Sequence, residues 1–227
     1  MVPRSVMDAI YERRSVRAYA ARPVDRAAVL QLLDAAVHAP TAMHEEPWEF
    51  VVVQDRATLR RLSDRALQTL RDRERRFALP ENVFYDAGTL IAICAKPLGP
   101  FVAADCWLAA ENLMLAACAM GLGTCVIGFA LEALNTPEWK AELKIPDGMT
   151  VYAPIIVGVP AGATPAAGRR KPEGSIGKRS RRPRRPSFAA RRVFLYDVAD
   201  APCAGVAQRQ SSCFVNSRSW VRIPSPA

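Results

Sequence analysis

The most apolar region of the chain lies near its middle and reads VAADCWLAAENLMLAACAMGLGTCVIGF over residues 102–129. Residues 102–120 are apolar nearly all round, which predicts a long helix buried on several sides. The Gly-Leu-Gly at 121–123 ends this helix, and residues 124–129 then predict a strand. A buried helix that leads directly into a strand indicates a domain that mixes helices and strands.

The flanking segments continue this mixture. Strands are predicted over residues 48–53, 89–95 and 151–159; the second is apolar throughout and should be central, whereas Pro154 favours an edge or bulge position in the third. Helices are predicted over residues 5–13, 25–37 with Asp25 as N-cap, 56–78, 131–134 and 137–143.

The positive charge of the chain is confined to its C-terminal part. Of the 227 residues, 1–173 hold 20 basic and 20 acidic side chains, whereas 174–227 hold 11 basic and 2 acidic ones, so the whole net charge of +9 lies in the last 54 residues. We therefore expect one folded domain over 1–173 and a basic tail, without regular structure, over 174–227. A nucleic-acid-binding protein should carry its basic face on the folded domain, which argues against that class.

The N-terminus, the longest apolar run, the cysteines and the histidines bear on the cellular compartment and on metal binding. The first eight residues contain no signal-peptide core, and the apolar run over 106–122 is short for a membrane span and bordered by Asp105. The six cysteines form no C-x-x-C pair, and the two histidines lack ligand spacing. We expect a cytoplasmic protein with free thiols, no bound metal and no membrane association. His38 should have a structural role at a helix end.

Two segments carry candidate binding residues. Arg13-Arg14-Ser15-Val16-Arg17 gathers three guanidiniums and a hydroxyl that could converge on a phosphate, although a solvated basic turn has the same composition. The loop over residues 39–48, APTAMHEEPW, is rigid and polar and enters a strand, so it could line a site or form an ordinary turn.

Two glycine-rich segments do not match nucleotide-binding loops. Gly121–Gly128 lacks the third glycine of a dinucleotide fingerprint and follows a helix where the fingerprint follows a strand. Gly174–Lys178 would require a glycine at Pro172 to match a phosphate-binding loop.

Taken together, the motifs resemble those of the flavin-dependent nitroreductase family. The matching pieces are RRSVR at 13–17, APTAMHEEPW at 39–48, AENLMLAA at 110–117, GLGTCVIG at 121–128, APIIVGVP at 153–160 and RRKP at 169–172. They occur in the family's order and spacing over residues 5–173, about three-quarters of the chain.

The resemblance implies an α+β fold with a mostly antiparallel central sheet flanked by helices. It also implies FMN bound without a covalent link at the interface of a homodimer, with the long helix at 102–120 as the dimer core. Arg13, Arg14 and Ser15 would hold the phosphate or ribityl end, and Arg17 the N1/O2 edge of the ring. Pro40, Thr41 and His44 would lie along the ring. Ile127 and Gly128 would approach it by backbone, and Arg169 and Arg170 would return to the phosphate.

The implied activity is electron transfer from NAD(P)H through FMN to a small conjugated acceptor such as a nitroaromatic or a quinone, by a ping-pong mechanism. No side chain needs to act as a nucleophile, in keeping with the absence of a catalytic triad pattern. The acceptor pocket would involve residues 60–85. Two rivals remain: a flavin-fragmenting or dehalogenating relative, and a non-enzymatic or inactive flavin-fold protein whose basic tail binds nucleic acid.

The chain departs from the family at some site positions. Many members have Asn in place of His44 and Gln in place of Glu46, and some have Glu in place of Ile127. A carboxylate near the ring opposes negative charge on reduced flavin, so Glu46 predicts a lowered flavin potential.

The tail is the larger departure from the family. Residues 205–224 resemble an out-of-frame translation of a transfer-RNA gene, which a frameshift near Glu173 would explain; the alternative is a genuine basic extension. A replaced C-terminus would weaken the dimer and, with it, the binding of FMN.

Overall fold

The structure, a computed structural model, describes residues 4–22, 24–73, 79–170, 173–176 and 192–195. Contacts between Cα atoms divide the chain into two units, the first built on residues 1–166 and the second on residues 167–217. The helices and strands of the first unit are α1 (Val6–Glu12), α2 (Arg26–Val37), the 3₁₀ turn η1 (Ala42–His44), β1 (Trp48–Val53), α3 (Arg56–Arg73), β2 (Thr89–Ala95), α4 (Val102–Ala119), β3 (Gly123–Val126), the 3₁₀ turn η2 (Gly128–Ala130), α5 (Leu131–Leu134), α6 (Pro137–Glu142) and β4 (Thr150–Gly158). The predicted α+β class is confirmed.

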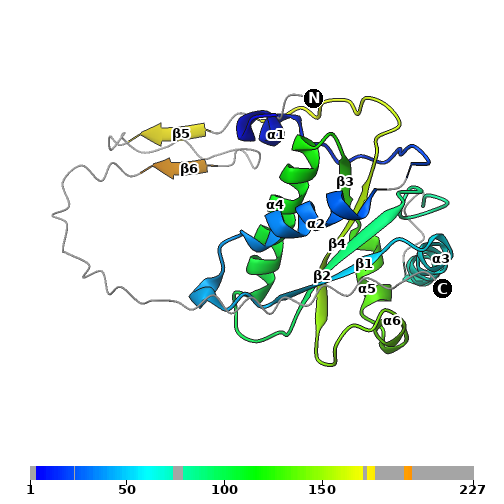
Figure 1. The fold of residues 1–227 in the computed structure, drawn as a ribbon. Coiled ribbons are helices and arrows are strands. Elements are labelled where there is room, and N and C mark those ends of the chain that lie inside the picture. The colour runs from blue at the N-terminus through cyan, green and yellow to red at the C-terminus, as the bar shows by residue number, and fades with distance from the viewer. Residues whose placement is uncertain (1–3, 23, 74–78, 171–172, 177–191, 196–227) are drawn as a thin grey trace. The chain divides into compact units, whose positions relative to one another are not determined.

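The four strands of the first unit form one antiparallel sheet in the order β1-β2-β4-β3 (Figure 1). Val51 pairs with Ala92, which in turn pairs with Pro154, and Cys125 of β3 pairs with Ile156. Every residue of β2 is buried, as its apolar sequence predicts for a central strand.

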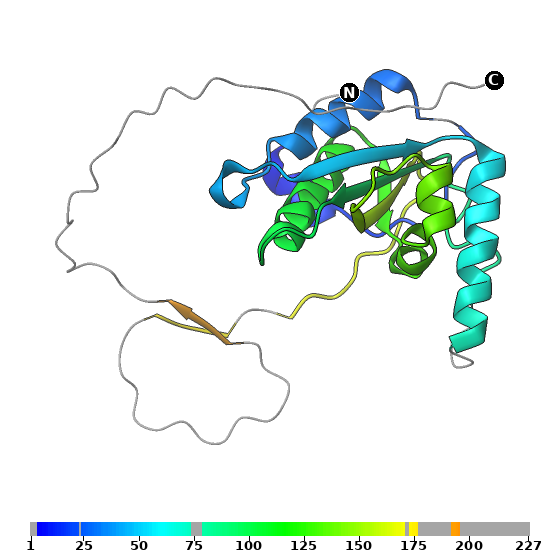
Figure 2. The same cartoon turned by 90° about the horizontal axis from the view of Figure 1, so that it is seen from below.

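Two hydrophobic cores lie on the two faces of this sheet because neighbouring strand residues point to opposite sides. Ile91 and Ile93 face the core that α2 and α4 complete, whereas Leu90 and Ala92 face the core that α3, α5 and α6 complete. Figure 2 shows α4 apart from α3, α5 and α6, in line with a sheet covered by helices on both faces.

The long helix α4 is buried along one side only within this single chain. Leu113 and Ala117 are fully buried against α2 and the sheet, whereas Trp107 and Leu108 remain 41% and 45% exposed. By length and composition α4 is apolar enough to cross a membrane, but half of it is buried inside the fold, as expected of a core helix. The exposed apolar side is what the predicted dimer contact requires.

The edge position predicted for Pro154 is wrong, because β4 lies between β2 and β3, although a bulge does lie near the start of β4. The carbonyl of Pro154 accepts a hydrogen bond from the Ile127 N–H at 2.9 Å, just where β3 ends. The nitrogen of Pro154, which has no hydrogen to donate, faces β3 as its carbonyl does. Because β3 ends at this point, no strand hydrogen bond is lost, and a central strand tolerates the proline. The bulge lies two residues earlier in β4, at Tyr152, because Ile93 pairs with Ala153 and the next residue, Cys94, pairs with Val151.

The predicted strand over 124–129 is too long. β3 ends at Val126, and the turn η2 begins at Gly128 after Ile127 takes φ −107° and ψ 77°. The other predicted elements agree with the structure to within two residues, except that α3 ends at Arg73 and the predicted continuation to residue 78 lies outside the described residues.

The second unit contains a short parallel pair of strands, β5 (Glu173–Ile176) and β6 (Arg192–Leu195). No regular structure was predicted after residue 173, so this pair is a correction. Val193, Phe194 and Leu195 favour a strand by residue type, although four residues are too few to show a period in the sequence. The arginine- and proline-rich run at 179–186 lies outside the described residues.

Candidate functional site

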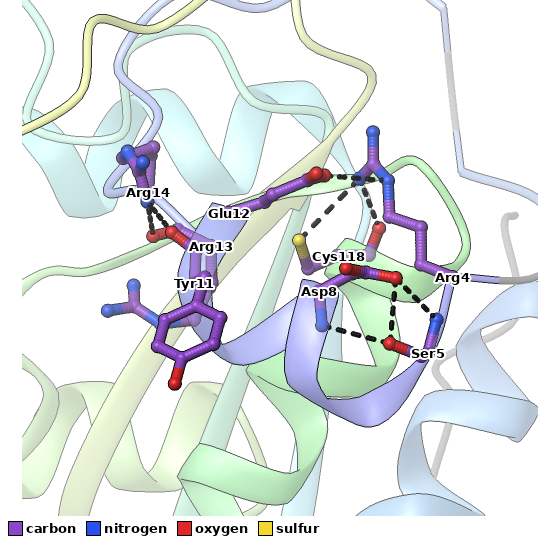
Figure 3. A network of polar contacts seen from close by, with 8 residues as sticks. All are labelled: Arg4, Ser5, Asp8, Tyr11, Glu12, Arg13, Arg14 and Cys118. Carbon is purple, nitrogen blue, oxygen red and sulfur yellow. Dashed lines mark hydrogen bonds and ion pairs between the residues drawn. The ribbon is translucent and has the colours of Figure 1, made fainter.

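The arginine-rich segment at 13–17 lies against the start of β3. Ser15 forms a parallel bridge with Thr124, and the Val16 N–H donates to the Thr124 carbonyl at 2.9 Å. A capping box between Ser5 and Asp8 fixes the start of the preceding helix α1 (Figure 3). These bonds hold the backbone of the arginine segment in a defined position beside the sheet.

Two glycines allow the segment to approach the sheet this closely. A Cβ on Gly123 would lie 2.8 Å from Cγ2 of Val16, and a Cβ on Gly158 would lie 2.6 Å from Cδ1 of Tyr19. Real side chains essentially never approach at such distances, so a larger residue at either position would displace the segment. Glycine at these two positions therefore allows the arginine segment to lie close against the sheet.

Two of the three candidate arginines have protein partners. Arg13 forms an ion pair with Glu111 of α4 at 3.6 Å, and its side chain is 19% exposed. Arg14 donates to the carbonyl oxygens of Tyr11 at 2.6 Å and of Arg13 at 2.9 Å (Figure 3). Each guanidinium has five N–H donors, so most donors of both side chains remain for a ligand.

The thiol of Cys125 shows that these side chains converge on β3. Burial raises the pKa of Cys125, and Arg17, a hydrogen bond with Ser15, and Arg13 each oppose that rise. Arg13, Ser15 and Arg17 therefore lie close enough to Cys125 on β3 to influence its thiol. The same strand leads directly to Ile127 and Gly128.

The backbone at Gly128 is open. A Cβ placed on Gly128 would meet no atom within 4 Å, in contrast to Gly123. Thr124 and Ile127 are three residues apart, or roughly 10 Å along a strand. One elongated ligand could therefore reach from the arginine segment to this backbone.

The predicted loop at 39–48 has an unusual backbone. Met43, His44 and Glu46 all have positive φ, between 44° and 58°, a region that non-glycine residues rarely adopt. The Ala42 N–H donates to Oδ1 of the buried Asp105 on α4 at 3.1 Å. Asp105 therefore anchors the loop that carries Pro40, Thr41 and His44.

A cavity of about 660 Å³ lies beside this loop, between the loop and the connection from β2 to α4. Met43 and the connection residues Leu98 and Phe101 are exposed apolar side chains in its wall, and Lys96 contributes a cation. No motif in the sequence predicted this cavity. The signal was present in the apolar residues Leu98 and Phe101, which flank Gly99 and Pro100 in a short connection.

The structure brings the candidate residues together in two groups rather than one. The first group is the loop at 39–48, which is anchored at Asp105 near the start of α4. The second is the arginine segment at 13–17; Arg4, which precedes it, donates to the Cys118 carbonyl near the end of α4 at 2.8 Å. Thirteen residues of helix separate these anchors, or about 20 Å. In Figure 1, α1 and the chain after α2 lie toward opposite ends of α4.

The remaining candidate residues have different outcomes. Arg169 and Arg170 belong to the second unit, so their return to the phosphate stays a prediction. Within the predicted acceptor region 60–85, Arg60, Asn82 and Tyr85 line smaller hollows. The Nδ1 atom of His38 lies 2.7 Å from the Asp34 carbonyl oxygen, consistent with a structural role at the end of α2.

The four cysteines of the described region are free and buried. Burial raises the pKa of Cys94 and of Cys106 to about 12, so both thiols stay protonated at neutral pH. No group of three or more His, Cys, Asp or Glu side chains that could hold a metal ion is found among the described residues.

Comparison with known proteins assigns the fold to a family. The sequence model of the Nitroreductase family matches residues 10–159, which is well over half of the chain. The chain belongs to the Nitroreductase family. A candidate NADH dehydrogenase/NAD(P)H nitroreductase of Archaeoglobus fulgidus is 30% identical over 156 residues, which cover 66% of this chain and 83% of that protein.

Solved structures give the same family assignment. A nitroreductase with bound FMN from Bacteroides fragilis superimposes with a TM-score of 0.68 at 28% identity, over 74% of this chain and 95% of that one. Among sequence relatives, an iodotyrosine deiodinase of Thermotoga neapolitana is 25% identical over 160 residues, which cover 62% of this chain and 86% of that protein. The predicted nitroreductase-like fold is confirmed.

Proposed function

We propose that this nitroreductase-family chain is an FMN-dependent oxidoreductase that passes electrons from NAD(P)H to a small conjugated acceptor by a ping-pong mechanism. The observation that carries the proposal is the position of the arginine segment, which Ser15 and Val16 join to Thr124 of β3, beside open backbone at Gly128. The FMN-bound relative from Bacteroides fragilis, at 28% identity, supports the choice of cofactor.

The residues present fit a phosphorylated, planar cofactor. Arg13 and Arg14 offer fork-shaped donors that match phosphate oxygens, and Ser15 adds a short hydroxyl donor. No atom lies within 4 Å of a Cβ placed on Gly128, so no neighbouring side chain crowds this backbone where a ring would approach it. Gly123 keeps the arginine segment and this backbone within reach of the same ligand.

Arg17 would tune the redox chemistry. That chemistry is supplied by FMN itself, which exchanges a hydride with NAD(P)H and electrons with the acceptor. A guanidinium fixed beside the N1/O2 edge stabilises the negative charge that develops there on reduction. The chain would therefore contribute binding, orientation and electrostatics, while none of its side chains forms a covalent bond to the substrate.

The site would be completed by a second copy of the chain. The loop at 40–44 is anchored at Asp105 near the start of α4, whereas Arg4 and Arg13 contact α4 further along, at Cys118 and Glu111. Two chains that pair their α4 helices in opposite directions would therefore bring one loop to the other chain's arginines. The exposed Trp107 and Leu108 provide an apolar surface for this pairing. A twofold axis makes both sites identical.

Two parts of the proposal rest on the resemblance alone. Arg169 and Arg170 would add positive charge at the phosphate, and a cytoplasmic location would supply NAD(P)H. The dehalogenating alternative gains support from the deiodinase relative. The alternative of a nucleic-acid-binding tail concerns residues that mostly lie outside the described region.

Anaerobic spectroscopy tests the proposal. The purified protein with added FMN should show a flavin absorbance band that NADH or NADPH bleaches. After removal of the nucleotide, a nitroaromatic or quinone should restore the band, as a ping-pong cycle requires. A flavin that stays oxidised with both nucleotides would contradict the proposed donor, and a protein that retains no FMN on a desalting column would contradict the cofactor.

A further inference from the structure

A groove that begins at Arg17, the last residue of the arginine segment, runs along residues 17–22, between the start of α3 and the loop at 80–88. It consists of three adjoining hollows of about 430, 230 and 150 Å³. The first and second share Tyr19, Arg60, Asn82 and Asp86, and the second and third share Ala21, Arg56, Asp86 and Gly88. The shared walls make the three hollows one continuous groove.

Four arginines line this groove in two pairs. Arg17 and Arg60 line the first hollow, and Arg22 and Arg56 line the third. Arg60 is also in an exposed ion pair with Asp64 at 3.3 Å, whereas Arg17, Arg22 and Arg56 have no carboxylate partner in the described part of the chain. Unpaired cations that face one groove create a positive potential that attracts an anionic ligand.

The opposite wall of the groove is well ordered. The Val83 N–H donates to Oγ of the buried Ser63 at 3.0 Å, and Nδ2 of Asn82 donates to Oδ1 of Asp86 at 2.9 Å. Asp86 lines all three hollows and Glu81 the first, so two carboxylates oppose four guanidiniums and the groove remains positive. A wall held by internal hydrogen bonds needs little reorganisation to bind a ligand.

We propose that this groove binds the adenosine half of NADPH. The inference rests on the proposed function, because Arg17 is both a predicted flavin contact and a wall of the first hollow. A dinucleotide whose nicotinamide lies on the flavin would extend from Arg17 into the groove. Arg17 and Arg60 then contact the diphosphate, and Arg22 and Arg56 contact the 2′-phosphate that distinguishes NADPH from NADH.

The groove therefore makes NADPH the preferred donor. Asp86, between the two arginine pairs, accepts a hydrogen bond from a ribose hydroxyl. Loss of one charge-assisted phosphate contact at this exposed site should weaken binding about tenfold. The effect should appear in binding alone and leave the electron-transfer step unchanged.

Calorimetry with adenosine nucleotides tests the groove directly. The protein is saturated with FMN, so that the predicted FMN site is filled, and the buffer contains no phosphate. Adenosine 2′,5′-bisphosphate should bind about tenfold more tightly than 5′-AMP. The substitution Arg56→Ala should remove most of that difference and leave 5′-AMP binding unchanged. In steady-state kinetics the same variant should raise KM for NADPH about tenfold at constant kcat and leave KM for NADH unchanged.

Arg61→Ala is the matched control, because Arg61 lies on the same helix but pairs with Glu142 and does not line the groove. Equal binding of the two nucleotides, or equal weakening in Arg61→Ala and Arg56→Ala, would overturn the proposal. Flavin bleaching by NADPH without bisphosphate binding rejects the groove but keeps the proposed function. Bisphosphate binding without bleaching keeps the groove as an anion site and rejects its role in donor binding.

Discussion

The absence of a Cβ atom at Gly123 allows the arginine segment to lie close to the sheet. Gly123 has the side chain of Val16 directly above it, whereas Gly128, five residues later, has open space. The two glycines belong to one motif in the sequence, yet their surroundings assign them different roles. Gly123 is required for packing, and Gly128 is free to face a ligand.

The substitution Gly123→Ala should destabilise the protein by about 1–3 kcal/mol, because the new Cβ overlaps Val16 and overpacks the contact. Gly128→Ala should leave stability nearly unchanged and weaken FMN binding, because its Cβ occupies the proposed ring space. Urea unfolding and flavin titration measure the two effects. The assignment fails if both variants lose stability equally, or if Gly128→Ala binds FMN like the unaltered protein.

Glu46 is the residue that most sets this chain apart from the family pattern. It follows His44 in the strained loop, and its N–H donates to Oγ1 of Thr41 at 3.4 Å. If the loop of one chain reaches the flavin of the other, the carboxylate opposes negative charge on the reduced ring. A redox titration of Glu46→Gln should then give a higher flavin potential. An unchanged potential would place Glu46 away from the ring.

At the scale of elements, α4 has one side buried in the core and another apolar side exposed. One side packs into the core with α2, while Trp107 and Leu108 leave apolar surface uncovered within the single chain. The sequence predicts the helix but not this division, because residues 102–120 are apolar on all sides. Only the position of the sheet and α2 distinguishes the buried side from the exposed one.

The substitution Leu108→Glu should therefore separate the proposed dimer and lower FMN affinity, without loss of the chain's own core. Ala141→Glu, an exposed position on α6 across the sheet, adds the same charge as a control. Gel filtration with increasing FMN measures both variants. Dimers of equal strength in the two variants would show that α4 does not form the interface.

The start of α3 has a side-chain cap that titrates. The Thr58 N–H donates to Oδ2 of Asp55 at 2.7 Å. Hydrogen bonding by the Thr58 side chain first, and by this backbone N–H second, holds the pKa of Asp55 below its ordinary value. A lowered folded-state pKa means stability that is present above the unfolded-state pKa and lost as pH falls through the folded-state pKa. Asp55→Ala should lower Tm at neutral pH, and the difference should shrink at acidic pH. A difference that is constant with pH would refute the cap.

At the scale of the whole molecule, local patterns predicted nearly all helices and strands, because periodicity and caps such as Asp25 are encoded nearby in sequence. The misjudged features depend on distant partners. The end of β3 is set by Pro154 on another strand. The strained loop is held by Asp105, 63 residues from Ala42.

The candidate site was predictable as a list of residues but not as an arrangement. The motifs named the arginine segment and the loop, yet no spacing in the sequence indicates that α4 separates them. The arginine groove escaped prediction for the same reason, since Arg17, Arg22, Arg56 and Arg60 come from two separate segments. The hypothesis of a frameshifted tail stays a prediction.

Mixed dimers test most directly whether two chains build one flavin site. One variant, Arg14→Ala/Arg17→Ala, lacks the arginine half, and the other, Thr41→Trp, blocks the loop half. Each alone should bind little FMN. In an equal mixture, half of the dimers are mixed and each mixed dimer keeps one intact site, so about a quarter of the flavin absorbance should return. No recovery in a mixture shown to contain mixed dimers would contradict the account, because a site within one chain cannot be restored by its partner.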